Sequence, residues 1–127
     1  MIKIKLSSLF VDNQGKALKF YTEVLGFVKK TEIPMGEFRW LTVSSEGSSD
    51  IELVLEPNAN PIASTYQKGL HEQGIPATAF EVDDIKKEYE RLQALGVNFK
   101  TPPTQAGPVS IAVFDDTCGN LIQIYQV

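Results

Sequence analysis

Cysteine and long apolar runs are scarce in this sequence of 127 residues. The single cysteine, Cys118, cannot form a disulfide within the chain, and no apolar stretch reaches the roughly 20 residues that span a bilayer. The N-terminus also lacks the apolar segment of a secretory signal peptide. These absences exclude a disulfide-stabilised domain and a helical membrane protein, and we expect a cytoplasmic protein with no membrane partner.

Positive charge is also in short supply. Twelve Lys and Arg against sixteen Asp and Glu give a formal net charge of −4, and the basic residues are scattered along the chain. Nucleic-acid-binding domains carry a basic patch, so we expect no nucleic-acid partner. The remaining composition, with 43% hydrophobic and 22% charged residues, is that of one ordinary globular domain.

The first half of the sequence predicts the element order β-α-β-β-β. An extended run from Ile2 to Val11 predicts a strand, and apolar residues at helical spacing predict a helix over 16–25 that ends at Gly26. Strand-forming runs follow at 27–33, 38–43 and 51–55, separated by turns rich in Gly, Pro and Ser.

The second half predicts the same order after a polar connector. A strand is expected over 75–82, then a helix that is capped by Asp83 or Asp84 and ends at Gly96. Three strands follow, over 97–100, 109–114 and 121–127.

Equivalent residues of the two halves lie 70 or 71 positions apart. The pairs are Val11 and Val82, Leu25 and Leu95, and Ile51 and Ile122. This nearly constant offset indicates a tandem duplication, with module one at 1–55, a connector at 56–74 and module two at 75–127.

Two stretches resemble the signature motifs of a known superfamily. Residues 17–27 read ALKFYTEVLGF and residues 114–123 read FDDTCGNLIQ. They are similar to the helix exit and the turn of the glyoxalase/bleomycin-resistance/extradiol-dioxygenase superfamily, also called vicinal oxygen chelate proteins. The resemblance covers nearly the whole chain, with Thr117 where the family usually has proline.

The resemblance implies an α+β fold in which two tandem βαβββ modules form a curled, eight-stranded mixed sheet around a cleft. Such proteins are commonly homodimers, and their cleft often holds a divalent metal. We therefore expect a homodimer, with modules paired within one chain or swapped between two chains, and a small-molecule ligand.

The four metal-ligand positions of the superfamily correspond here to Leu6, Glu52, Ala77 and Gln123. Leu6 and Ala77 have no donor atom, and one carboxylate with one amide falls short of the three or four protein donors that hold a divalent ion tightly. The sequence therefore predicts no metal site and no cofactor.

Alternation along the strands predicts which side chains share a face with the two polar residues that remain. The expected ligand-binding residues are Leu6, Ser8, Phe10, Phe38, Trp40, Glu52, Val54, Ala77, Ala79, Gln123 and Tyr125. Thr42 is expected beside them, and the alternation along 109–114 assigns no face. Aromatic and apolar side chains with a few polar groups are typical of a small-molecule site.

Glu52 is the one candidate for a catalytic residue, and it has several interpretations. It is a former metal ligand, a general base, or a carboxylate that anchors a ligand or is idle beside Gln123. A base needs a substrate proton within reach, which a sequence does not show, so anchoring or idleness is favoured. Trp40 suits stacking on a flat ligand or filling the core. His71 is expected to be solvated and Cys118 to be inert in a tight turn.

Three functions remain open. The first is a metal-free protein of the bleomycin-resistance kind that binds an apolar or aromatic small molecule. The second is a lyase, isomerase or dioxygenase of the same superfamily that uses Glu52, with or without an atypical divalent metal site, and only the fold favours it. The third is an interaction domain whose cleft is occupied by a protein partner.

Overall fold

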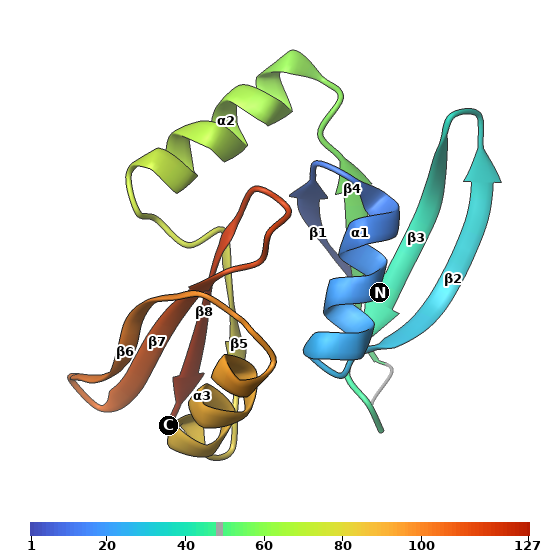
Figure 1. The fold of residues 1–127 in the computed structure, drawn as a ribbon. Helices are drawn as coiled ribbons and strands as arrows, with labels where there is room; N and C mark the ends of the chain where they lie inside the picture. The colour runs from blue at the N-terminus through green and yellow to red at the C-terminus, as the bar shows by residue number, and fades with distance from the viewer. Residues whose placement is uncertain (48–49) are drawn as a thin grey trace. The chain divides into compact units, whose positions relative to one another are not determined.

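The computed structural model describes residues 1–47 and 50–127 of the chain. These residues form two compact units, Met1–Ser64 and Thr65–Val127 (Figure 1). The first unit contains β1 (Leu6–Val11), α1 (Gln14–Lys19), a π-helical turn η1 (Phe20–Val24), β2 (Val28–Met35), β3 (Phe38–Ser44) and β4 (Glu52–Pro57). After α2 (Pro61–Glu72), which crosses the boundary, come β5 (Thr78–Glu81), α3 (Ile85–Ala94), β6 (Phe99–Ala106), β7 (Val109–Asp115) and β8 (Leu121–Gln126).

The strands form two mixed sheets with the same topology. The first sheet has the order β1-β4-β3-β2 and the second has the order β5-β8-β7-β6. In each sheet the first and last strands of the module pair in parallel and the other pairs are antiparallel. The predicted α+β class and repeated βαβββ order are confirmed. The single eight-stranded sheet is corrected to two sheets of four, because each module brings its last strand back beside its first.

The first strand begins later than the sequence pattern predicts. Ile2 and Ile4, expected in the strand, are 100% and 83% exposed and lie before β1. The Glu52 N–H donates to the Lys5 carbonyl at 2.9 Å, and β4 begins there. The correction follows because alternating apolar residues form a strand only where another strand supplies hydrogen-bond partners.

The helix termini match their sequence signals. Asn13 and Asp84 occupy equivalent caps, and their side chains accept hydrogen bonds from Lys16 N at 2.9 Å and Lys87 N at 3.1 Å. Beyond the helices, Gly26 and Gly96 adopt φ angles of 89° and 87°, which favour glycine because it has no Cβ.

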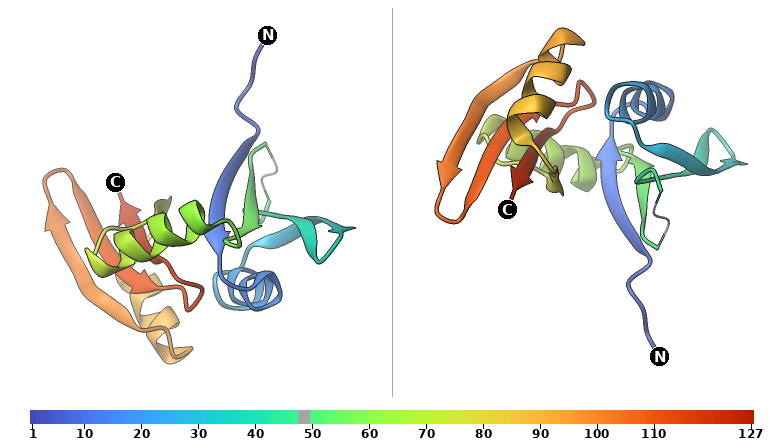
Figure 2. Two further views of the ribbon diagram at one scale, coloured as in Figure 1. Left: turned by 90° about the horizontal axis from the view of Figure 1, so that it is seen from above. Right: turned by 90° about the horizontal axis from the view of Figure 1, so that it is seen from below.

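Each sheet buries one face against its helix (Figure 2). In the first unit this core contains the buried residues Leu9, Val11, Tyr21, Leu41, Val43 and Leu55. In the second unit the rings of Tyr89 and Phe99 lie 4.6 Å apart and those of Phe99 and Phe114 lie 5.5 Å apart. The aromatic residues of both helices therefore serve mainly to attach each helix to its own sheet.

Gln14, the first residue of α1, inserts its carboxamide between β3 and β4. Its Nε2 donates to the carbonyls of Arg39 at 2.7 Å and Leu55 at 2.8 Å, and its Oε1 accepts from Arg39 N at 3.1 Å. The carboxamide is a substitute backbone partner at the point where the two strands separate. Figure 1 shows β3 diverging from β4 toward the start of β3.

In module two the corresponding strands stay paired. The residues 71 positions after Arg39 and Leu55 are Ser110 and Gln126, and these pair directly between β7 and β8. Ile85, which is buried, stands in the place of Gln14. One side chain thus accounts for the shorter β3–β4 pairing, which in the described residues covers Thr42↔Val54 and Val43↔Leu53.

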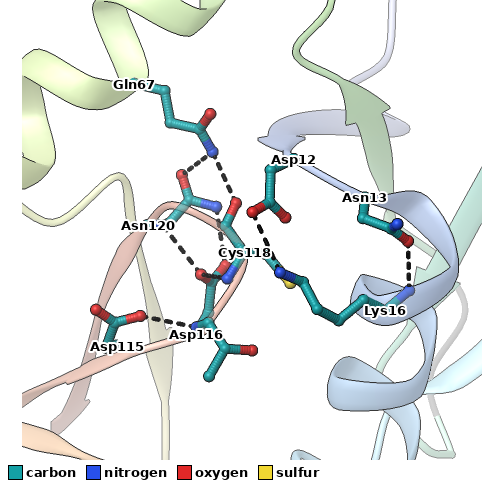
Figure 3. A network of polar contacts seen from close by, with 9 residues as sticks. Asp12, Asn13, Lys16, Gln67, Asp115, Asp116, Cys118 and Asn120 are labelled. Atoms are coloured by element: carbon teal, nitrogen blue, oxygen red, sulfur yellow. Dashed lines mark hydrogen bonds and ion pairs between the residues drawn. The ribbon is translucent and has the colours of Figure 1, made fainter.

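A buried polar network fastens α2 to the turn between β7 and β8 (Figure 3). Asp116 Oδ1 accepts from the backbone N–H groups of Cys118 at 2.7 Å and Asn120 at 3.0 Å, and its Oδ2 accepts from Asn120 Nδ2 at 2.8 Å. Gln67 of α2 donates to the Cys118 carbonyl and to Asn120 Oδ1, both at 3.1 Å. Gly119 is required here because a Cβ would lie 2.7 Å from Gln67 Nε2.

His71 is part of the same attachment, which corrects its expected place as a solvated residue. Its Nε2 lies 2.9 Å from Asp115 Oδ2, and it is half-buried because α2 packs beside the turn. Thr117 in this turn has φ 63°, a value that proline cannot adopt. Its departure from the usual family residue therefore accompanies a different turn conformation.

Candidate functional site

The first sheet has an open face, defined here as the face opposite α1, that carries the candidate residues of module one. The register pairs Leu6 with Glu52 in parallel and Thr42 with Val54. Because partners in register point to the same side of a sheet, alternation extends this face along each strand. It brings together the candidates Leu6, Ser8, Phe10, Phe38, Trp40, Glu52 and Val54.

The hairpin of β2 and β3 adds exposed apolar side chains to the open face. Ile33 pairs with Trp40 and Met35 with Phe38. Ile33, Met35 and Phe38 are 53%, 63% and 40% exposed, whereas Trp40 is half-buried. The sequence reasoning missed Ile33 and Met35, although their alternate positions in the predicted strand over 27–33 and its turn were the available signal.

The opposite face of this hairpin is charged. Arg39 Nη1 lies 2.6 Å from Glu32 Oε2, and Lys29 Nζ lies 2.9 Å from Glu32 Oε1. Hydrogen bonds from Lys29 and then Arg39 lower the pKa of Glu32 below its usual value. Arg39, next to Trp40 in sequence, is therefore directed away from the open face.

Glu52 is held in place by a buried neighbour. The Oγ1 of Thr42, a fully buried residue of β3, donates to Glu52 Oε1 at 2.6 Å. Within the described part of the first unit, no Lys, Arg or His forms an ion pair with Glu52. The half-buried carboxylate thus has one oriented oxygen and retains acceptor capacity toward a group that approaches the open face.

The second sheet presents the corresponding residues of module two on its face opposite α3. Ala79 pairs with Gln123 and Glu81 pairs with Tyr125, and from β7 Val113 and Ile111 join the same face. The register thereby resolves the face of residues 109–114. Ala77 precedes β5, and its N–H donates to the Leu121 carbonyl at 2.8 Å, so the residue directly beside Gln123 is Ala79.

The two modules carry different chemistry at equivalent positions. The residues 71 positions after Thr42 and Glu52 are Val113 and Gln123. Module one therefore places a hydroxyl beside a carboxylate where module two places an apolar side chain beside a neutral amide. The sequence reasoning named all four side chains or their strands but missed the hydrogen bond, whose only signal was this Thr-to-Val difference.

The residues at the superfamily's metal-ligand positions do not fit a divalent ion. Glu52 and Gln123 offer oxygen donors, but the side chains of Leu6 and Ala77 have none. Across residues 1–47 and 50–127, no group of three or more His, Cys, Asp or Glu side chains is arranged to hold a metal.

Two duplicated βαβββ units with a polar position on each open face define a class of proteins, and the chain's relatives identify it. Residues 3–124 match the sequence profile of the Glyoxalase/Bleomycin resistance protein/Dioxygenase superfamily. The chain belongs to this superfamily. None of the helices formed by the described residues has the length and apolar character to cross a lipid bilayer.

Three relatives illustrate the similarity. The chain is 58% identical over 126 residues to the uncharacterized protein YurT of Bacillus subtilis (strain 168), which covers 98% of this chain and 99% of that protein. Its fold is similar to UcmS2, with TM-score 0.85, 28% identity and 98% of each chain covered. It is also similar to TnmS3, an antibiotic binding protein from Streptomyces sp. CB03234, with TM-score 0.79, 29% identity, and 99% of this chain and 96% of that chain covered.

Proposed function

We propose that this protein binds a small flat molecule, apolar or aromatic, without a metal. The observation that carries the proposal is an oriented carboxylate, Glu52, on a sheet face with Trp40, Phe10 and Phe38. Such a face offers apolar area for affinity and one polar group for orientation. The similarity to the antibiotic-binding TnmS3 supports binding rather than turnover as the function.

The proposal includes the architecture that the superfamily implies. Residues 1–127 are one glyoxalase-like domain, with module one at 1–55, the connector at 56–74 and module two at 75–127. The open faces of two modules line one cleft in a curled arrangement, with the modules from one chain or from two chains of a homodimer. Module two then contributes Ala77, Ala79, Gln123 and Tyr125. The single, buried Cys118 suits a cytoplasmic location.

The emission of Trp40, the only tryptophan, provides the test. A screen of flat aromatic metabolites and antibiotics should find compounds that quench it, equally with and without EDTA. Each ~100 Å² of apolar surface buried is worth roughly 2.5 kcal/mol before association costs, so binders in the micromolar range are expected. Trp40→Phe, followed by calorimetry, is the control that separates loss of the reporter from loss of binding.

Two results would count against the proposal. Absence of any binder among chemically diverse aromatics would leave the interaction-domain function standing. One equivalent of metal per chain that survives dialysis and disappears in Glu52→Ala would move the lyase, isomerase or dioxygenase function ahead. Light scattering tests the dimer separately, since a mass near 14.1 kDa at micromolar concentration would identify a monomer.

A further inference from the structure

We infer that Thr42 is a positioning residue that makes the site select ligands bearing a cationic or hydrogen-bond-donating group. This inference rests on the proposed binding function and adds the class of ligand. Thr42 is fully buried, so it does not itself offer a surface to a ligand. Its hydroxyl acts through Glu52, whose Oε1 it binds at 2.6 Å.

The hydrogen bond restricts the carboxylate in a way that matters for binding. A glutamate on a sheet face has several rotamers, and a ligand that uses it must order that side chain. Thr42 supplies this order in advance. Because its hydroxyl engages Oε1, the acceptor sites left over, chiefly on Oε2, are directed toward the open face and demand a donor from the ligand.

The other module shows what this position becomes without such positioning. Val113 replaces the hydroxyl donor and Gln123 replaces the carboxylate, at the same 71-residue offset. The amide of Gln123 both donates and accepts hydrogen bonds, so it has no preference for a cation. The charge preference of the protein is therefore assigned to module one and to the Thr42–Glu52 pair.

The experiment compares two matched aromatic probes by calorimetry. 1-Naphthylmethylamine is a cation at neutral pH, and 1-naphthalenemethanol has nearly the same shape without the charge. The wild type should prefer the cation by about tenfold or more, as expected of a charge-assisted hydrogen bond. Glu52→Gln should abolish this preference and leave the affinity for the neutral probe within about twofold, since the shape is conserved.

Thr42→Val, which installs the module-two residue, should reduce the preference for the cation by roughly threefold to tenfold through the cost of ordering one side chain. Thr42→Ser should restore it. Thr22→Val is the matched control, because it removes a threonine hydroxyl of the same module that donates to the Leu18 carbonyl at 2.7 Å. It should leave the preference unchanged.

The outcomes separate this inference from the proposed function. If Thr42→Val weakens both probes equally, Thr42 has only a structural role and the inference is wrong while the binding function stands. The same conclusion follows if the preference is unchanged or if serine fails to restore it. If the wild type binds neither probe and no other aromatic compound, the proposed function itself fails and the inference fails with it.

Discussion

The two modules share a fold but stabilise their central strands differently. In module one the carboxamide of Gln14 bridges Arg39 and Leu55, where module two pairs Ser110 directly with Gln126. In module two, the buried carboxylate of Asp116 organises the turn that leads into β8. Duplication thus preserved the apolar face of each sheet, while single buried polar side chains determined how its strands are joined.

The same comparison applies to the open faces. Module one has Trp40 and the Thr42–Glu52 pair, whereas module two has Ile111, Val113 and Gln123 at the equivalent positions. Backbone pairing is indifferent to these substitutions, because the side chains on an open face do not enter the helix-side core. Such a face is therefore free to change its chemistry while the fold persists.

The largest expected effect lies at the turn of module two. Asp116→Ala removes the acceptor of two buried backbone N–H groups and of Asn120 Nδ2, and should lower the free energy of unfolding by about 4 kcal/mol. Urea denaturation measures the loss. Asp12→Ala, which breaks an exposed ion pair with Lys16, should cost under about 1 kcal/mol. Similar losses in both variants would show that the buried network does not stabilise module two.

A smaller loss is expected when module one receives the residue of module two. Gln14→Ile leaves the Arg39 N–H and two strand carbonyls without their partner, which should cost about 3 kcal/mol. Gln93→Ile, at an exposed helix position, is the control and should cost under about 0.5 kcal/mol. Hydrogen exchange at the Arg39 amide should accelerate in Gln14→Ile.

The opposite result would redefine the comparison. If Gln14→Ile keeps its stability and the Arg39 amide stays protected, β3 and β4 have paired directly as β7 and β8 do. The carboxamide would then be dispensable for the pairing of strands in module one.

The smallest expected effect is a gain. Thr117 holds φ 63°, which is unfavourable for a β-branched residue, and Thr117→Gly should stabilise the protein by about 1 kcal/mol. Its N–H bond to Asp115 Oδ1 at 2.7 Å is a backbone bond that glycine retains. Thermal unfolding of the variant measures the gain. A decrease in midpoint would mean that the entropy gained by the unfolded chain outweighs the relief of strain.

The sequence by itself determined the features that depend on local periodicity. The 71-residue offset, the caps at Asn13 and Asp84, and the glycine helix ends at Gly26 and Gly96 all follow from residues close together in the chain. Strand alternation likewise assigned Glu52 and Trp40 to one face, because side chains of a strand point to opposite sides in turn.

Only the tertiary structure decided the contacts that depend on register and packing. Gln14 reaches Leu55 across 41 positions, Gln67 reaches Asn120 across 53, and Thr42 reaches Glu52 from the neighbouring strand. The division into two sheets and the place of His71 beside Asp115 belong to the same group. The physical reason is that a hydrogen bond is directional within a few tenths of an ångström, whereas apolar patterning specifies a face and leaves the partner open.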